Sequence, residues 1–147
     1  METPTGRWIA ELILAHIDEL AVEVATIARQ TIPLYASLPP DVVKQRFVES
    51  YQAQAQTFAE GSMEPLRAYM EPTITARIQS GADAASLIQL VTVLHDGVRR
   101  LIEQDRAANP ARANEAVRQV ETVNKNLRLM FSEINLRYLT KPPKPPA

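Results

Sequence analysis

Apolar residues recur at steps of three and four along most of the chain, which is the spacing of one face of an amphipathic α-helix. The first stripe occupies residues 9–27 and predicts one long helix. A second helix is expected from about Pro40 to Glu60, between the turn at residues 38–41 (LPPD) and the break at residues 61–62 (GS). Its inward positions are Val43, Phe47, Tyr51, Ala55 and Phe58.

Three more stripes follow. The third helix is expected from Ser62 to about Gln79, with a kink where Pro72 removes a backbone donor. The fourth begins after Asp83 as its N-cap and ends near residue 108, and the fifth begins at residues 109–110 (NP) and runs to about residue 139. No stretch alternates with period two for long enough to be a strand. We therefore predict an all-α fold of about five main helices with a long C-terminal helix, either a bundle or a globin-like pile.

Length and composition indicate a single domain and exclude the chemistry of cysteine. A chain of 147 residues with 46% hydrophobic and 22% charged residues has the make-up of a single folded domain. We assign residues 1–140 to a helical sensor or dimerisation domain and residues 141–147 (KPPKPPA) to a proline-rich linker or tail. The absence of cysteine excludes disulfides, thiol catalysis and thiolate metal sites.

The charges give no sign of nucleic acid or membrane as a partner. The net charge is −1, and although residues 111–147 carry seven basic and three acidic side chains, no dense basic run with interleaved aromatics is present. No apolar run approaches the roughly 20 residues of a membrane span, and the acidic start of the chain lacks the basic region of a signal peptide. We therefore expect a cytoplasmic location.

The last stripe carries the most specific pattern in the chain. Its apolar positions alternate steps of four and three residues, which is the spacing of a coiled-coil seam. Asn124 falls at an a position, where a single buried asparagine aligns two parallel helices. The pattern predicts a homodimer interface formed by Val117, Val120, Asn124, Leu127, Phe131, Ile134 and Tyr138. The alternative is an ordinary core helix that tolerates one asparagine.

Both histidines, His16 and His95, fall on apolar stripes. We expect each ring to be a core or edge residue whose nitrogens find hydrogen-bond partners. The alternatives are a haem-binding sensor that uses His95 or His16 as its single ligand, and a pH-sensitive switch. A metal site is the weakest alternative, because two histidines and no cysteine leave carboxylates to complete it.

Catalytic motifs are missing from the chain. Its four glycines form no phosphate-binding loop, and neither a Gly-x-Ser-x-Gly motif nor a cysteine nucleophile is present, so we expect no enzyme activity and no catalytic residues. The aromatic row of the second helix predicts core packing, with a small apolar ligand pocket as the alternative. Together with the histidines, the candidate pocket residues are His16, Phe47, Tyr51, Phe58 and His95.

Several features together resemble a known family. They are the turn at residues 32–41 (IPLYASLPPD), the helix end at residues 76–81 (ARIQSG), the leucine-rich helix that follows and the long terminal helix. Over about residues 8–139 the chain resembles the N-terminal sensor domain of RsbT co-antagonist proteins, the RsbR/RsbRD type of the stressosome. The resemblance implies a globin-like, typically haem-free dimer without a cofactor, whose terminal helices project toward an output domain. Residues 141–147 fall where that junction would lie.

The leading hypothesis is a non-enzymatic sensory and regulatory dimerisation domain of bacterial stress signalling. It relays a packing change along its C-terminal helix to an output domain or signalling protein. The two alternatives are the haem-binding sensor and a helical domain that binds a small apolar ligand.

Overall fold

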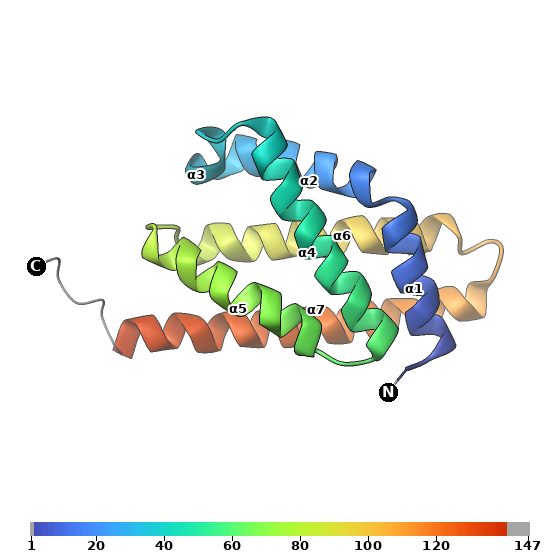
Figure 1. Cartoon of the computed structure of the whole chain (residues 1–147). Helices are drawn as coiled ribbons and strands as arrows, with labels where there is room; N and C mark the ends of the chain where they lie inside the picture. Colours follow the sequence, from blue (N-terminus) through green and yellow to red (C-terminus); the bar gives the residue numbers. More distant parts are fainter. Residues whose placement is uncertain (1, 141–147) are drawn as a thin grey trace, which may run out of the picture.

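The computed structural model describes residues 2–140, without the side chains of residue 34 and residues 138–140. Every regular element of this part is a helix, so the all-α prediction and the long C-terminal helix are confirmed (Figure 1). The globin-like arrangement stays a prediction. The elements are α1 (Pro4–Ala15), α2 (Ile17–Thr31), the one-turn α3 (Pro33–Ala36), α4 (Pro40–Glu60), α5 (Glu64–Gln79), α6 (Ala84–Gln104) and α7 (Pro110–Thr140).

Helix ends with strong local signals lie where the sequence predicts them. Pro40 occupies the first turn of α4, and the helix ends before Gly61, whose φ of 65° is in the left-handed region that favours glycine. The Asp83 carboxylate accepts the backbone N–H of Ser86 at 2.7 Å and caps α6. The fourth helix ends at Gln104, earlier than expected.

The first helix corrects the prediction of one continuous helix over residues 9–27. α1 ends at Ala15, and His16 has φ −118° and ψ 17°, outside the helical region, before α2 begins. The apolar stripe nevertheless continues across the break, since Ile13 and Leu20 are both buried. Both α1 and α2 pack against α4, so contacts with another helix bend the chain at a point where periodicity continues unchanged.

The longest helices form the frame of the domain. α6 and α7 lie side by side and antiparallel, α4 crosses this pair, and α5 lies along α7 (Figure 1). α1 and α2 pack along α4, and α2 also contacts α6. The apolar faces of these helices meet in one core, and α4, α5, α6 and α7 surround a cavity within it.

Among residues 2–140, no helix combines the length and the apolar character that crossing a membrane requires. The expected linker or tail at residues 141–147 lies outside the described residues.

Candidate functional site

A cavity of about 50 Å³ lies between α4, α5, α6 and α7, with Tyr35 of α3 as part of its wall. A space of this size holds a few water-sized groups, which is enough for the body of a small organic molecule. Its apolar lining comes from four helices and consists of Phe47, Met70, Ile74, Leu87, Leu90, Val91, Leu94 and Phe131.

The rest of the wall is polar, and none of it is acidic. Arg46 and Ser50 lie four residues apart on α4, and therefore on one face of that helix. The Tyr69 hydroxyl donates to the backbone carbonyl of Arg46 at 2.9 Å. Across the cavity, Arg77 Nε donates to the Tyr35 hydroxyl at 3.2 Å. The complete polar lining is Tyr35, Arg46, Ser50, Tyr69, Thr73 and Arg77.

The Ser50 hydroxyl has no hydrogen-bond partner in the part of the chain that the structure describes, although the residue is only 3% exposed. A serine within a helix ordinarily donates to the carbonyl four residues earlier, which here belongs to Arg46 and receives the Tyr69 hydroxyl instead. An unpartnered buried hydroxyl costs about 1–3 kcal/mol. Seven other hydroxyls do make this bond to the carbonyl four residues back: Thr26, Thr31, Thr73, Ser80, Thr92, Thr122 and Ser132.

The polar wall of the cavity provides positive charge and hydrogen-bond donors. Arg46 Nη1 is buried without a partner, and neither Arg46 nor Arg77 forms an ion pair within the described residues. Burial raises the pKa of Tyr69 above its usual value, the charge of Glu49 raises it further, and Arg77 opposes the rise. Tyr69 therefore stays protonated and keeps the Arg46 carbonyl occupied.

Only one of the five predicted pocket residues lines this cavity. Phe47 does, whereas Phe58 lies nearer the start of α5 and the middle of α7. Sequence reasoning missed Arg46, Ser50 and Arg77. The spacing of four residues between Arg46 and Ser50, on either side of Phe47, was a signal that these polar groups share a face with the core.

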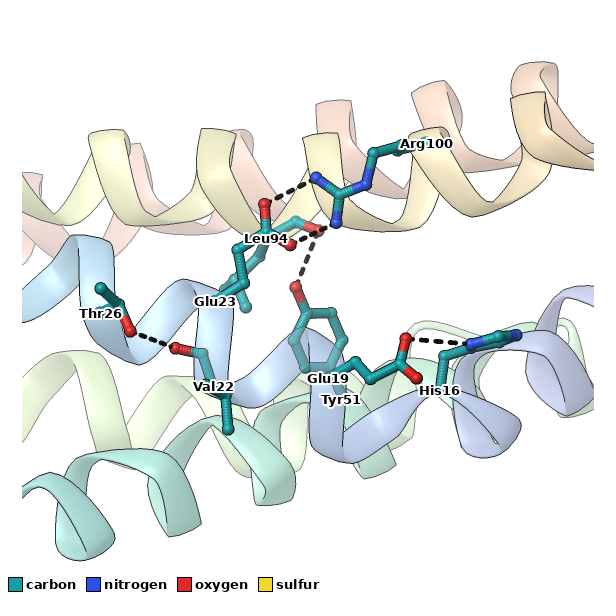
Figure 2. Close-up of polar contacts among 8 residues, drawn as sticks. All are labelled: His16, Glu19, Val22, Glu23, Thr26, Tyr51, Leu94 and Arg100. Atoms are coloured by element: carbon teal, nitrogen blue, oxygen red, sulfur yellow. Dashed lines mark hydrogen bonds and ion pairs between the residues drawn. The ribbon is translucent and has the colours of Figure 1, made fainter.

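Tyr51 instead faces α2 and α6 (Figure 2). It is fully buried, and its hydroxyl donates to the backbone carbonyl of Leu94 at 3.3 Å. Burial raises the pKa of Tyr51 above its usual value, the charge of Glu23 adds to the rise, and Arg100 counters it. Arg100 binds both carboxylate oxygens of Glu23, with Nη1 at 2.6 Å from Oε1. The polar groups of this contact therefore find their partners within the chain.

The histidine positions do not fit a haem. His95 Nε2 lies 3.0 Å from Glu121 Oε1, and the space beside its ring is about 20 Å³, the size of one water molecule and far smaller than a macrocycle. Three buried polar atoms without partners surround this space: His95 Nδ1, Gln54 Nε2 and Asn124 Oδ1. His16 is 38% exposed at the break between α1 and α2 and lines none of the cavities described here.

Most of the predicted dimer seam packs within its own chain. Val120, Leu127, Phe131 and Ile134 are buried, Val117 and Asn124 are half-buried, and the Tyr138 side chain lies outside the described residues. α7 contacts α1, α5 and α6 of the same chain, as an ordinary core helix does. A dimer through this seam stays a prediction, and it requires these side chains to exchange neighbours of their own chain for those of a partner.

The comparisons with known proteins identify no relative. No family model, curated protein or solved structure matches the chain. Within the described residues, no group of three or more histidine, aspartate or glutamate side chains is placed to hold a metal ion. The cavity is therefore interpreted from its own geometry.

Proposed function

We propose that the chain is a non-enzymatic sensory domain that binds a small molecule in the cavity between α4, α5, α6 and α7. The observation that carries the proposal is the Ser50 hydroxyl, which is buried at an apolar cavity and has no acceptor among the described residues. A ligand that accepts this hydrogen bond recovers the free energy that the unpartnered hydroxyl costs. Apolar walls with a few polar groups that fix orientation are the usual composition of a ligand site.

Phe131 connects the cavity with the long C-terminal helix. Its ring lines the cavity, and on the same helix Leu127 and Ile134 are buried one turn to either side. A ligand that presses on this ring acts on a row of close-packed side chains, which transmits small displacements because packed interiors are not easily compressed. Occupancy therefore changes the packing of α7, which is the relay expected for a sensor.

α5 is the wall best suited to admit a ligand. Pro72 lies inside this helix and has no N–H to donate to the carbonyl of Ala68, so one backbone bond of the helix is missing. Ala68 lies on the exposed side of α5. Thr73 and Ile74, which follow the proline, line the cavity, and a helix with a missing bond at this point bends there most easily.

The test is a titration of the chain with n-butanol and with butanoate, monitored by the methyl NMR signals of Leu90 and Leu94 and by amide exchange along α7. We expect shifts at both leucines and slower exchange around Phe131 with at least one probe. Ser50→Leu fills the cavity and abolishes the response. Ser132→Leu makes the same change on the exposed face of α7 and retains it. Unchanged signals with both probes, or an undiminished response in Ser50→Leu, contradict the proposal.

The finer form of the proposal is a stressosome-type sensor of the RsbT co-antagonist kind, acting as a homodimer on an output domain. It is supported by the resemblance in the turn at residues 32–41 and in the order of the helices. Light scattering at micromolar concentration tests the dimer, and a strict monomer contradicts it. A dimer through the seam places Leu127 and Phe131 against the partner chain. Leu129 lies outside this seam, on the exposed face of α7, so Leu129→Lys leaves the measured mass of the dimer unchanged.

A further inference from the structure

We propose that the ligand of this cavity is a small organic anion, an aliphatic carboxylate of about four to six carbons in all. This inference rests on the proposed function, since it concerns the same cavity. It adds the charge and the size of what is bound.

The cavity has a surplus of hydrogen-bond donors. Ser50 Oγ and Arg46 Nη1 are both buried atoms without a partner, and they lie on one face of α4. No aspartate or glutamate lines the cavity. A carboxylate is the group that answers this arrangement, because its two oxygens accept from two donors and its charge matches that of a guanidinium.

Among the described residues, four of the twelve arginines form an ion pair with a carboxylate of the chain itself. The pairs within the described residues are Arg99 with Glu121, Arg100 with Glu23, Arg106 with Glu103 and Arg137 with Glu71. Arg46 and Arg77 converge on one cavity without such a partner. The carboxylate that these two lack is the one the ligand brings.

The apolar walls and the volume set the rest of the ligand. An inorganic anion has no surface to place against Phe47, Leu90 and Phe131, so the anion carries a hydrocarbon body. A water-sized group occupies about 10–15 Å³ on this measure of volume, and a methylene is of similar size. The cavity of about 50 Å³ therefore takes about three to five such groups beyond the carboxylate.

In the bound state, one carboxylate oxygen accepts from Ser50 and the other from Arg46. Arg77, on α5, remains bonded to Tyr35 and adds positive charge to the cavity wall. Tyr69 keeps the Arg46 carbonyl occupied, so the Ser50 hydroxyl is free to turn toward the ligand.

The experiment compares carboxylates with alcohols of equal carbon number, from butanoate to hexanoate, by isothermal titration calorimetry at neutral pH. We expect the carboxylates to bind at least tenfold more tightly. Arg46→Met retains the length of the apolar stem and removes the charge, so it abolishes this preference. Arg67→Met makes the same change on α5 away from the cavity and leaves the preference intact.

The outcomes separate this inference from the proposed function. Equal binding of alcohols and carboxylates that Ser50→Leu abolishes overturns the anion and leaves a ligand-binding domain. Tight binding of acetate or inorganic phosphate, or of carboxylates of twelve carbons only, overturns the size and the apolar body. A preference that survives in Arg46→Met overturns the assigned partner. No binding of any probe overturns both proposals.

Discussion

Two contacts of α4 combine a tyrosine with an arginine, and the chain completes only one of them. Toward α2 and α6, the Tyr51 hydroxyl reaches the Leu94 carbonyl and Glu23 binds Arg100 (Figure 2). Toward α5, Arg46 Nη1 and Ser50 Oγ remain without partners beside a cavity. Both contacts contain a tyrosine and an arginine, so these two residue types alone do not explain the difference.

What distinguishes them is the presence of a carboxylate. Glu23 supplies the anion in the first contact, and Gly97 brings α6 so near that an added Cβ would lie 3.0 Å from the Tyr51 hydroxyl. The second contact has no acidic side chain and retains about 50 Å³ of space. A contact whose polar groups are satisfied within the chain serves stability, whereas one whose buried donors lack an acceptor is suited to a ligand.

The largest expected effect comes from adding atoms to each contact. Gly97→Val forces a branched side chain against Tyr51 and Leu20, and we expect the free energy of unfolding to fall by about 2 kcal/mol. Ser50→Leu fills existing space and removes an unpartnered hydroxyl, so we expect stability equal to or above that of the unchanged chain. Urea denaturation measures both. Similar losses in the two variants contradict the distinction between the two contacts.

How well the sequence predicts the fold depends on whether the signal is local. Pro40 and Gly61 delimit α4 through their own backbone preferences, so both ends were predictable from the sequence. The break at His16 has no such signal, because the stripe of apolar residues runs through it and the bend arises from packing on α4. In the same way, the four-three spacing of α7 identifies a buried face but not the chain that buries it.

The candidate site was harder to predict for a related reason. Arg46 and Ser50 look in the sequence like polar residues of an amphipathic helix, and such residues are ordinarily solvated. Their role depends on Tyr69, which lies on another helix and occupies the Arg46 carbonyl. A pattern along one helix contains no information on which carbonyl a distant tyrosine reaches, so the cavity becomes visible only in three dimensions.

An intermediate effect is expected at alkaline pH. Burial raises the pKa of Tyr51 in the folded chain, whereas the hydroxyl of the unfolded chain ionises above about pH 10. The contribution of the Tyr51 hydroxyl to the free energy of unfolding is therefore fully present below that pH. Above it the unfolded chain binds fewer protons than the folded chain, so stability falls by up to about 1.4 kcal/mol per pH unit.

Tyr51→Phe loses one hydrogen bond at every pH but lacks this alkaline decline, as urea denaturation between about pH 9 and pH 11 would show. Tyr69→Phe serves as the comparison at the contact of α4 with α5. Its pKa is also raised, but the side chain is only half-buried, so its removal changes the slope less. If the free energy of unfolding falls equally steeply with pH in the unchanged chain and in Tyr51→Phe, the alkaline decline does not come from Tyr51.

The smallest effect tests the arginines themselves. Glu23 and Arg100 are 45% and 46% exposed, and solvent screens such pairs, so Arg100→Met lowers the free energy of unfolding by about 0.5 kcal/mol. Arg46 has no carboxylate to lose, and Arg46→Met removes a guanidinium nitrogen buried without a partner. We therefore expect no loss of stability from Arg46→Met in the ligand-free chain. Urea denaturation with a double-mutant cycle on Glu23→Gln and Arg100→Met measures the first effect. A larger loss from Arg46→Met than from Arg100→Met would show that Arg46 already stabilises the fold without a ligand, and the contrast between the two sides of α4 would then disappear.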